Sequence, residues 1–166
     1  MKVVLFEPQI PQNTGNIART CAAANASLIL VRPFGFSTNS RHMKRAGLDY
    51  WNEVTVEEID DLTSYVENKN CFFFSSKAKK NYTEINYPDD SLLIFGSETK
   101  GLPDPFWQKW PDRFLTIPMA PNIRCINLAC SVAIVLYEAL RQNHFLNNET
   151  TSERTKLMRS DVVIGR

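Results

Sequence analysis

The sequence lacks the residue patterns that build metal sites. It contains only two histidines, and its four cysteines form no Cys-x-x-Cys pair. Zinc sites are assembled from such groups of cysteine and histidine, so we expect no metal ion in this protein. Cys125 and Cys130 are expected to be small buried residues rather than nucleophiles, because no histidine lies near them in the sequence to activate a thiol.

Long apolar runs are also absent. No stretch approaches the roughly 18 apolar residues that a membrane-spanning helix needs. Near the N-terminus, the run Val3–Phe6 is ended by Glu7 and Pro8, which makes it too short for the apolar core of a signal peptide. These absences predict a cytoplasmic protein whose cysteines are reduced.

The chain has little excess charge of either sign, since its formal net charge is +1. A protein that binds nucleic acid over its whole surface would be strongly basic. The charge is unevenly placed, however: residues 1–45 carry six Lys or Arg and one acid, whereas residues 46–67 carry seven acids and no base. A local basic surface is therefore one interpretation, and an ordinary solvated surface with patches of charge is the other.

Five short apolar runs predict the strands of a single α/β domain. None of them alternates between apolar and polar residues, which is typical of strands that are buried on both faces. The runs are Val3–Phe6, Leu28–Val31, Cys71–Phe74, Leu92–Phe95 and Phe114–Ile117. Segments with helical patterns lie between some of them, and this alternation predicts a mainly parallel sheet with helices on both faces.

Three segments have helical patterns. Residues 13–26 are rich in alanine and carry one apolar stripe. Residues 55–68 begin with Thr55 and Glu58 at the spacing of a capping box and continue as an amphipathic helix. Residues 127–142 are strongly apolar, and the first of them, Asn127, is a candidate N-cap.

The polar C-terminal segment interrupts the alternation of strands and helices. We therefore expect a folded domain over residues 1–146, followed by a polar extension over residues 147–166.

Three loops that follow predicted strands are candidates for a binding site. They are residues 7–19, the segment "GSETKGLP" at 96–103, and the segment "PMAPNIRCIN" at 118–127. Ligands of open α/β sheets bind beyond the carboxyl ends of the strands. One such loop is more often a routine turn, but three at the same edge of a sheet favour a composite pocket.

The second of these loops begins like a phosphate-binding loop, which reads GxxxxGK[ST]. Gly96 and Gly101 have the right separation, but Leu102 and Pro103 stand where the lysine and the hydroxyl residue should be, and the carboxylate of Glu98 would repel a triphosphate. The two glycines permit close approach of a flat ligand such as a purine, or else they form a tight turn. The carboxylate suits a cationic ligand, or else it caps the loop's own backbone N–H groups.

Taken together, "NTGNIARTCAA", "LLIFGSETKGLP" and "IPMAPNIRCINLACSVAIVLYEALRQ" resemble the three motifs of the SPOUT superfamily of RNA methyltransferases. Within this superfamily, the sequence resembles most the small single-domain family that 2'-O-methylates the wobble nucleotide, position 34, of tRNA. The similarity runs from about Val3 to Gln142. It implies a C-terminal trefoil knot, S-adenosylmethionine as methyl donor, tRNA as substrate and a homodimer. Because the last helix is more apolar than one covered face requires, we expect this helix and part of the first to form the dimer interface. The donor carries a sulfonium cation and no phosphate, which agrees with a carboxylate in the glycine loop.

The resemblance also implies roles for individual residues. Arg19 matches the residue that activates the 2'-hydroxyl, although a guanidinium resists deprotonation and orienting a phosphate is the simpler role. Asn13, Glu98 and Asn127 are expected to frame the catalytic site. Donor contacts are expected from Phe74, Gly96, Ile117, Met119, Cys125 and Leu128. Cys125 departs from the family's usual serine, and a thiol is a weaker hydrogen-bond donor than a hydroxyl.

The segment "RHMKRAGLDYW" is the predicted RNA-binding face. At helical spacing Arg41, Lys44 and Arg45 share one side, which suits the phosphates of an anticodon stem. The aromatic residues Tyr50 and Trp51 either stack on an unpaired base or belong to the core. Two other functions are weighed against the enzyme: a catalytically silent RNA-binding relative, and a nucleotide-binding module unrelated to RNA.

Overall fold

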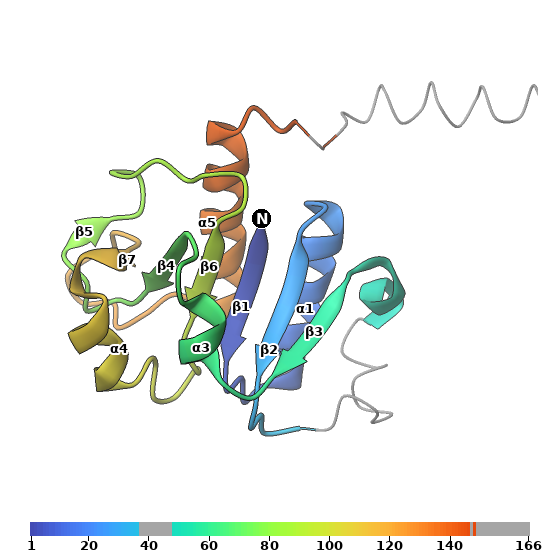
Figure 1. Cartoon of the computed structure of the whole chain (residues 1–166), viewed down its shortest axis with the longest axis horizontal. Coiled ribbons are helices and arrows are strands. Elements are labelled where there is room, and N and C mark those ends of the chain that lie inside the picture. The colour runs from blue at the N-terminus through green and yellow to red at the C-terminus, as the bar shows by residue number, and fades with distance from the viewer. Residues whose placement is uncertain (37–47, 147, 149–166) are drawn as a thin grey trace, which may run out of the picture.

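A computed structural model of the chain describes residues 1–36, 48–146 and 148. Its centre is a seven-stranded sheet with the strand order β3-β2-β1-β6-β4-β7-β5 (Figure 1). The strands are β1 (Lys2–Phe6), β2 (Ser27–Val31), β3 (Val56–Ile59), β4 (Cys71–Phe74), β5 (Lys80–Asn81), β6 (Leu92–Phe95) and β7 (Phe114–Thr116). The helices are α1 (Pro11–Ala23), α3 (Leu62–Val66), α4 (Asp104–Lys109) and α5 (Leu128–Gln142), with the short 3-10 helices η1 (Leu48–Glu53) and η2 (Pro111–Arg113).

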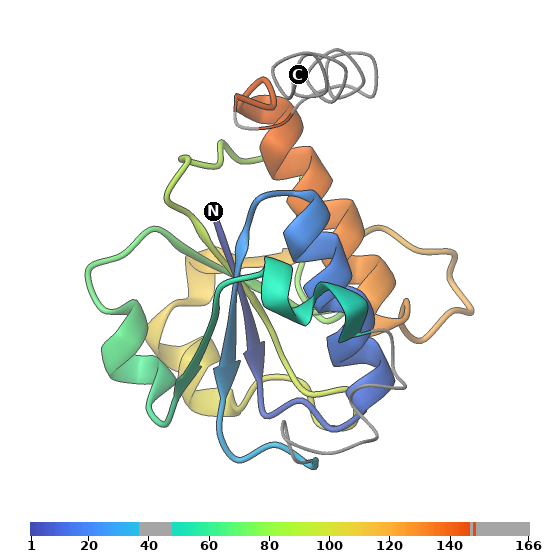
Figure 2. The same ribbon diagram turned by 90° about the vertical axis from the view of Figure 1, so that its right-hand side faces the viewer.

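The sheet buries side chains on both faces. On β1, Val3 and Leu5 belong to the apolar cluster that includes side chains of α1 and α5, whereas Val4 belongs to the cluster that includes side chains of α3 and α4. Figure 2 shows these two pairs of helices on opposite sides of the sheet. Because successive residues of a strand face different helix layers, the strands read as unbroken apolar runs. The predicted α/β fold with helices on both faces is confirmed.

The strand order decides where the loops meet. All pairings between the described strands are parallel. β6 lies between β1 and β4, and β7 follows on the far side of β4. The carboxyl ends of β1, β6, β4 and β7 are therefore neighbours along one edge of the sheet, although the segments that follow them are far apart in the sequence.

The five predicted strands are confirmed as β1, β2, β4, β6 and β7, but the helix predicted over residues 55–68 is wrong in its first part and is observed only as α3, Leu62–Val66. Residues Val56–Ile59 form the edge strand β3, which pairs with β2. The helix that follows begins at Leu62, and its N-cap is Asp61, whose carboxylate accepts hydrogen bonds from the backbone N–H groups of Thr63 and Ser64. Pairing with a neighbouring strand outweighs the local capping-box pattern.

The last helix is as predicted. The side chain of Asn127 accepts hydrogen bonds from the backbone N–H groups of Ala129 and Cys130, so it is the N-cap of α5. No helix among the described residues is long and apolar enough to cross a membrane. The predicted extension over residues 147–166 lies, apart from Asn148, outside the described residues. The trefoil knot stays a prediction of the resemblance.

Candidate active site

A pocket of about 480 Å³ lies where the carboxyl ends of β4, β6 and β7 meet the first turns of α1 and α5. The three candidate loops all contribute to it, so they form one composite pocket, as the sequence predicts. The residues predicted to contact a donor all line it: Phe74, Gly96, Ile117, Met119, Cys125 and Leu128. So do three of the predicted catalytic residues: Asn13, Glu98 and Asn127. The structure brings these nine residues together, while their roles stay predictions.

Arg19 is not brought into this pocket. Its side chain is exposed on α1 and does not belong to the pocket lining. It follows Asn13 by six residues, which corresponds to more than one and a half helical turns, so the two side chains leave different sides of the helix. The predicted RNA-binding residues Arg41, Lys44 and Arg45 lie outside the described residues. Trp51 is partly buried and packs against the apolar core, as the second interpretation of this residue expects.

A chain of polar side chains joins the three loops along one edge of the site. Because the Oδ1 atom of Asn127 accepts the helix-capping bonds, its Nδ2 atom points outward and donates to Oδ1 of Asn13 at 3.0 Å. The Nδ2 atom of Asn13 in turn donates to Oε1 of Glu98 at 2.9 Å. Each side-chain amide thus has a defined orientation. The buried Asn13 makes a hydrogen bond through both its side-chain oxygen and its side-chain nitrogen.

The Glu98 carboxylate caps the N-terminus of α1 and not the backbone of its own loop. Its two oxygens accept hydrogen bonds from the backbone N–H groups of Gln9 at 2.9 Å and Ile10 at 3.2 Å, directly before α1. Ile10 is the N-cap residue of α1 and has no side chain that could cap the helix. The glutamate supplies from the second loop the negative group that a helix N-terminus favours. This explains a carboxylate in a glycine loop without reference to a ligand.

The two glycines form a tight turn. Ser97 and Gly101 exchange backbone hydrogen bonds of 2.9 and 3.3 Å, and Gly101 has a φ of 70°. A Cβ atom on Gly96 would collide with the carbonyl carbon of Gly101 and lie 2.5 Å from the backbone nitrogen of Leu102. Gly96 is therefore required for its own loop to close. This is the tight turn that the sequence offers as one of two reasons for the glycines, and close approach of a ligand is not needed to explain Gly96.

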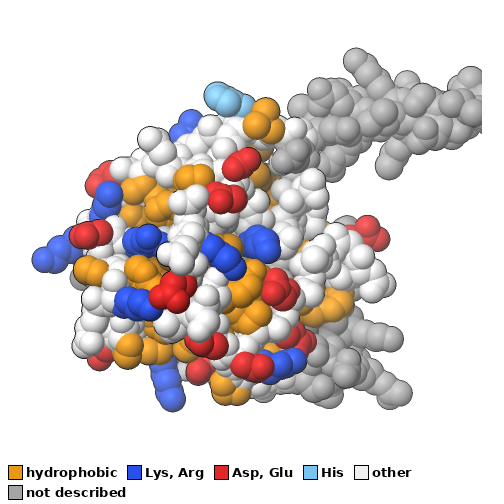
Figure 3. Space-filling model, in the orientation of Figure 1, with side chains coloured by type: hydrophobic (Ala, Val, Ile, Leu, Met, Phe, Trp, Pro, Cys, Tyr) orange, Lys and Arg blue, Asp and Glu red, His pale blue; other side chains and the backbone are white. Residues whose placement is uncertain are grey.

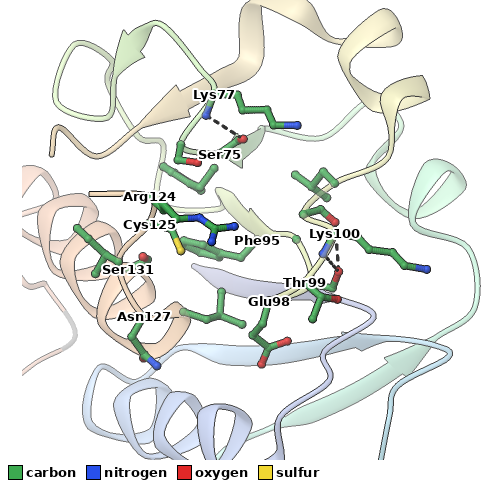
Figure 4. Close-up of a pocket in the computed structure, with 18 of the residues that line it drawn as sticks. Ser75, Lys77, Phe95, Glu98, Thr99, Lys100, Arg124, Cys125, Asn127 and Ser131 are labelled. Atoms are coloured by element: carbon green, nitrogen blue, oxygen red, sulfur yellow. Dashed lines mark hydrogen bonds between the residues drawn. The ribbon is translucent and has the colours of Figure 1, made fainter. Parts of the chain in front are cut away.

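The pocket lining combines apolar, polar and basic side chains. Phe74 and Phe95 stack at a centroid distance of 4.8 Å and both line the pocket. In Figure 4, Arg124 and Cys125, from the segment before α5, face the cavity across from the loop that carries Glu98 and Lys100. The hydroxyl groups of Ser75, Thr99 and Ser131 add polar atoms to the lining. Such a cavity suits a mostly apolar, flat ligand with a few polar groups.

Sequence reasoning missed a fourth loop. Ser75, Ser76 and Lys77 follow β4 and line the pocket together with the three predicted loops. The signal was present, because these residues also stand directly beyond the carboxyl end of a buried strand. Trp107 of α4 was missed as well, since nothing in its local sequence places it beside the other loops.

The cysteine prediction is wrong for two residues. Cys125 and Cys130 are exposed, whereas Cys21 and Cys71 are buried. Cys125 is exposed because it belongs to the loop that lines the pocket, and Cys130 because it lies in the first turn of α5, away from the sheet. In the part of the chain that the structure describes, no three His, Cys, Asp or Glu residues are grouped to hold a metal ion.

Comparison with known proteins decides the family. The model of the family described as "SpoU rRNA Methylase family" matches residues 1–137. The chain belongs to this family. The SpoU methylase match covers the pocket and its three loops, and it confirms the resemblance to RNA methyltransferases that the motifs indicate.

Individual relatives extend the SpoU methylase comparison. A Lactobacillus gasseri protein with a provisional name, RNA (cytidine(34)-2'-O)-methyltransferase, is 49% identical over 156 residues, covering 90% of this chain and 84% of its own. A solved structure described for the 2-OH methylation of C/U34 on tRNA has 39% identity and a TM-score of 0.80, and the match covers 86% of this chain and 95% of that chain. An AdoMet-bound rRNA methyltransferase from Sinorhizobium meliloti has 26% identity and a TM-score of 0.76, with 84% of this chain and 55% of that chain covered.

Proposed function

We propose that this protein transfers the methyl group of S-adenosylmethionine to the ribose 2'-hydroxyl of the wobble nucleotide, position 34, of tRNA. The observation that carries the proposal is the composite pocket, in which nine predicted site residues from distant segments converge. The relatives described for C34 or C/U34 methylation support the nucleotide, and the AdoMet-bound rRNA methyltransferase structure supports the donor.

The pocket fits the donor chemically. Its volume of about 480 Å³ lies within the range usual for small-molecule sites. The apolar wall of Phe74, Ile117 and Leu128 suits the face of an adenine, and the hydroxyl groups of Ser75 and Ser131 suit the polar amino-acid part. The bound donor supplies a methyl group made electrophilic by the sulfonium.

The protein's part in the transfer is to orient the ribose hydroxyl and to keep water out. In the reaction, the hydroxyl oxygen forms a bond to the methyl carbon as the carbon–sulfur bond breaks, and the hydroxyl proton is released. The chain of Asn127, Asn13 and Glu98 holds the edge of the pocket in one geometry through hydrogen bonds of 2.9 to 3.0 Å. Arg19, exposed outside the pocket, is assigned to hold the RNA phosphate beside the reacting ribose, which matches a guanidinium that stays charged.

The decisive experiment is incubation of the protein with methyl-labelled S-adenosylmethionine and total tRNA, followed by mapping of the labelled nucleotide. Label on the 2'-oxygen of position 34 supports the proposal. Label at another position would overturn the assigned nucleotide. Donor binding with no transfer to any tRNA would instead support a silent RNA-binding relative, for which the thiol of Cys125 in the pocket is the structural argument.

Donor binding is expected to protect one cysteine from alkylation and to leave its neighbour reactive. Cys125 lines the pocket and Cys130 does not, although both are exposed. Burial raises the pKa of Cys21 to about 12, and burial also raises the pKa of Cys71, so neither should react at pH 8. With donor at about 100 times its Kd, alkylation of Cys125 should slow about a hundred-fold, because about one pocket in a hundred stays free.

The measurement is mass spectrometry of the labelled peptides over time, and Cys130 is the internal control. Equal protection of both cysteines would indicate a global change, and no protection of Cys125 would place the donor elsewhere.

We further propose a homodimer that uses α5 and part of α1. Ile134 and Tyr137 lie on the outer face of α5 and are 37% and 45% exposed, which is unusual for large apolar side chains of one helix. Replacing both with glutamate should give a monomer by light scattering at micromolar concentration, whereas the unaltered protein should give a dimer. A monomeric unaltered protein would refute the proposal.

A further inference from the structure

We propose that the single-stranded RNA next to the target nucleotide lies along a track beside the donor pocket, formed by the loop after β4 and by Trp107. The inference rests on the proposed function, because it names the surface by which that same site would hold its RNA. This track consists of a second pocket and of the basic side chains at the mouth of the donor pocket.

The second pocket adjoins the first. It has a volume of about 320 Å³ and lies between the loop after β4 and the segment from α4 to β7. Its lining consists of Lys77, Ala78, Lys79, Lys80, Trp107, Pro111, Asp112 and Phe114. Lys77 and Trp107 belong to both pockets, so a chain of nucleotides could pass from one pocket to the other along these two side chains.

The cations along this track differ from the other described cations. Elsewhere, Arg32, Lys109 and Arg141 pair with carboxylates, and Lys2 and Lys69 contact Tyr65. Among the described residues, five basic side chains make no hydrogen bond, ion pair or cation–π contact with a described partner. They are Lys77, Lys79, Lys80, Lys100 and Arg124, and every one of them lines one of the two pockets.

Unpartnered cations gathered around two joined cavities point to an anionic polymer. Figure 3 shows blue side chains over the end of the sheet where β5, β7 and α4 lie. In Figure 4, Lys77 and Lys100 extend from the rim rather than into the cavity, where a phosphate backbone passing the mouth could meet them. Asp112 is the single acid of the second pocket, so the local charge stays positive.

Trp107 favours an unpaired strand over a duplex. One face of its ring stacks on Phe114 at a centroid distance of 3.6 Å, and the remaining surface of the indole lines both pockets. Proteins that bind single-stranded RNA stack unpaired bases on aromatic side chains between cationic contacts to the backbone. The bases of a duplex are already stacked on each other and could not enter.

The test compares two double variants that remove the same charge. Lys79→Ala with Lys80→Ala removes two track cations that do not line the donor pocket. Lys2→Ala with Lys69→Ala is the matched control, since both lysines lie beside Tyr65 and line neither pocket. Equilibrium binding is measured with an anticodon stem-loop RNA and with a duplex RNA of equal phosphate number, at several salt concentrations, alongside donor affinity.

The track variant should bind the stem-loop roughly ten-fold more weakly at 0.1 M salt, with a log–log salt slope smaller by about 1.4, because each lost phosphate contact removes about 0.7. Its donor affinity and the RNA binding of the control should be unchanged. Trp107→Phe, which keeps a ring against Phe114, should weaken stem-loop binding without changing the salt slope, because stacking releases no ions.

Three results would overturn the track: unchanged stem-loop binding in the track variant, an equal loss in the control, or an equal loss for duplex RNA. None of these results bears on the proposed function, which fails only if the unaltered protein transfers no labelled methyl group to the ribose of position 34. Binding is measured without catalysis, so the track is tested in either case.

Discussion

Gly96→Ala is expected to reduce affinity for S-adenosylmethionine about a hundred-fold, near the upper end of what forced overpacking costs. The added Cβ atom would collide with the carbonyl carbon of Gly101 and lie 2.7 Å from its Cα atom, and both belong to backbone that cannot rotate away. The loop between β6 and α4 must then open, and this loop forms one wall of the donor pocket. Calorimetric titration of the folded variant with donor measures the loss.

Gly101→Ala is the matched control for this prediction. A Cβ atom at Gly101 meets nothing within 4 Å, but the residue has a φ of 70°, which is strained for alanine. We expect a loss of about 1 kcal/mol in the free energy of unfolding, with donor affinity nearly retained. If both variants bound the donor equally well, the closure of the Gly96 turn would not shape the pocket.

Glu98→Ala is expected to lower the rate of methyl transfer at saturating donor by about a hundred-fold or more, the effect that a misplacement of about 1 Å can have. The substitution removes the acceptor for Gln9, Ile10 and Asn13 together, so the first loop loses its attachment to the second. It should also reduce the free energy of unfolding by about 2 kcal/mol, because the lost hydrogen bonds are to a charged group.

Glu98→Gln should fall between the alanine variant and the unaltered protein. One amide oxygen can still accept from Ile10 and Asn13, but the amide nitrogen would then face the N–H group of Gln9 as a second donor. Glu84→Gln, at an exposed glutamate that accepts only from Asn81, is the control and should change neither quantity. Transfer at the normal rate in Glu98→Ala would show that the carboxylate does not position the site.

The unusual composition of the second loop now has a physical explanation. Its carboxylate, which is incompatible with a phosphate-binding loop, serves the N-terminus of a helix whose N-cap residue, Ile10, lies 88 residues earlier in the chain. The loop thus has two functions: its backbone lines the pocket, and its one acid fixes the neighbouring loop to it. The cations that a phosphate-binding loop would hold inside lie instead at the rim.

The sequence by itself determined five of the seven strands, the last helix and most of the pocket residues. Strands covered on both faces must be apolar at every position, so five of them could be read directly from composition. The cap of α5 depends only on Asn127 and the backbone N–H groups of Ala129 and Cys130. The three loops follow from a rule about strand ends, because the carboxyl ends of parallel strands lie along one edge, and the individual pocket residues follow from the resemblance of the motifs.

Only the tertiary structure decided the matters that depend on partners distant in the chain. Residues Val56–Ile59 are a strand because β2 offers them an open edge, which no local pattern records. Glu98 is a cap because the strand order sets β6 beside β1 and so brings its loop to Gln9. The loop after β4 and Trp107 join the site for the same reason. A hydrogen bond or a ring contact between residues far apart leaves no periodicity in the sequence, and it forms only when the packed sheet brings them together.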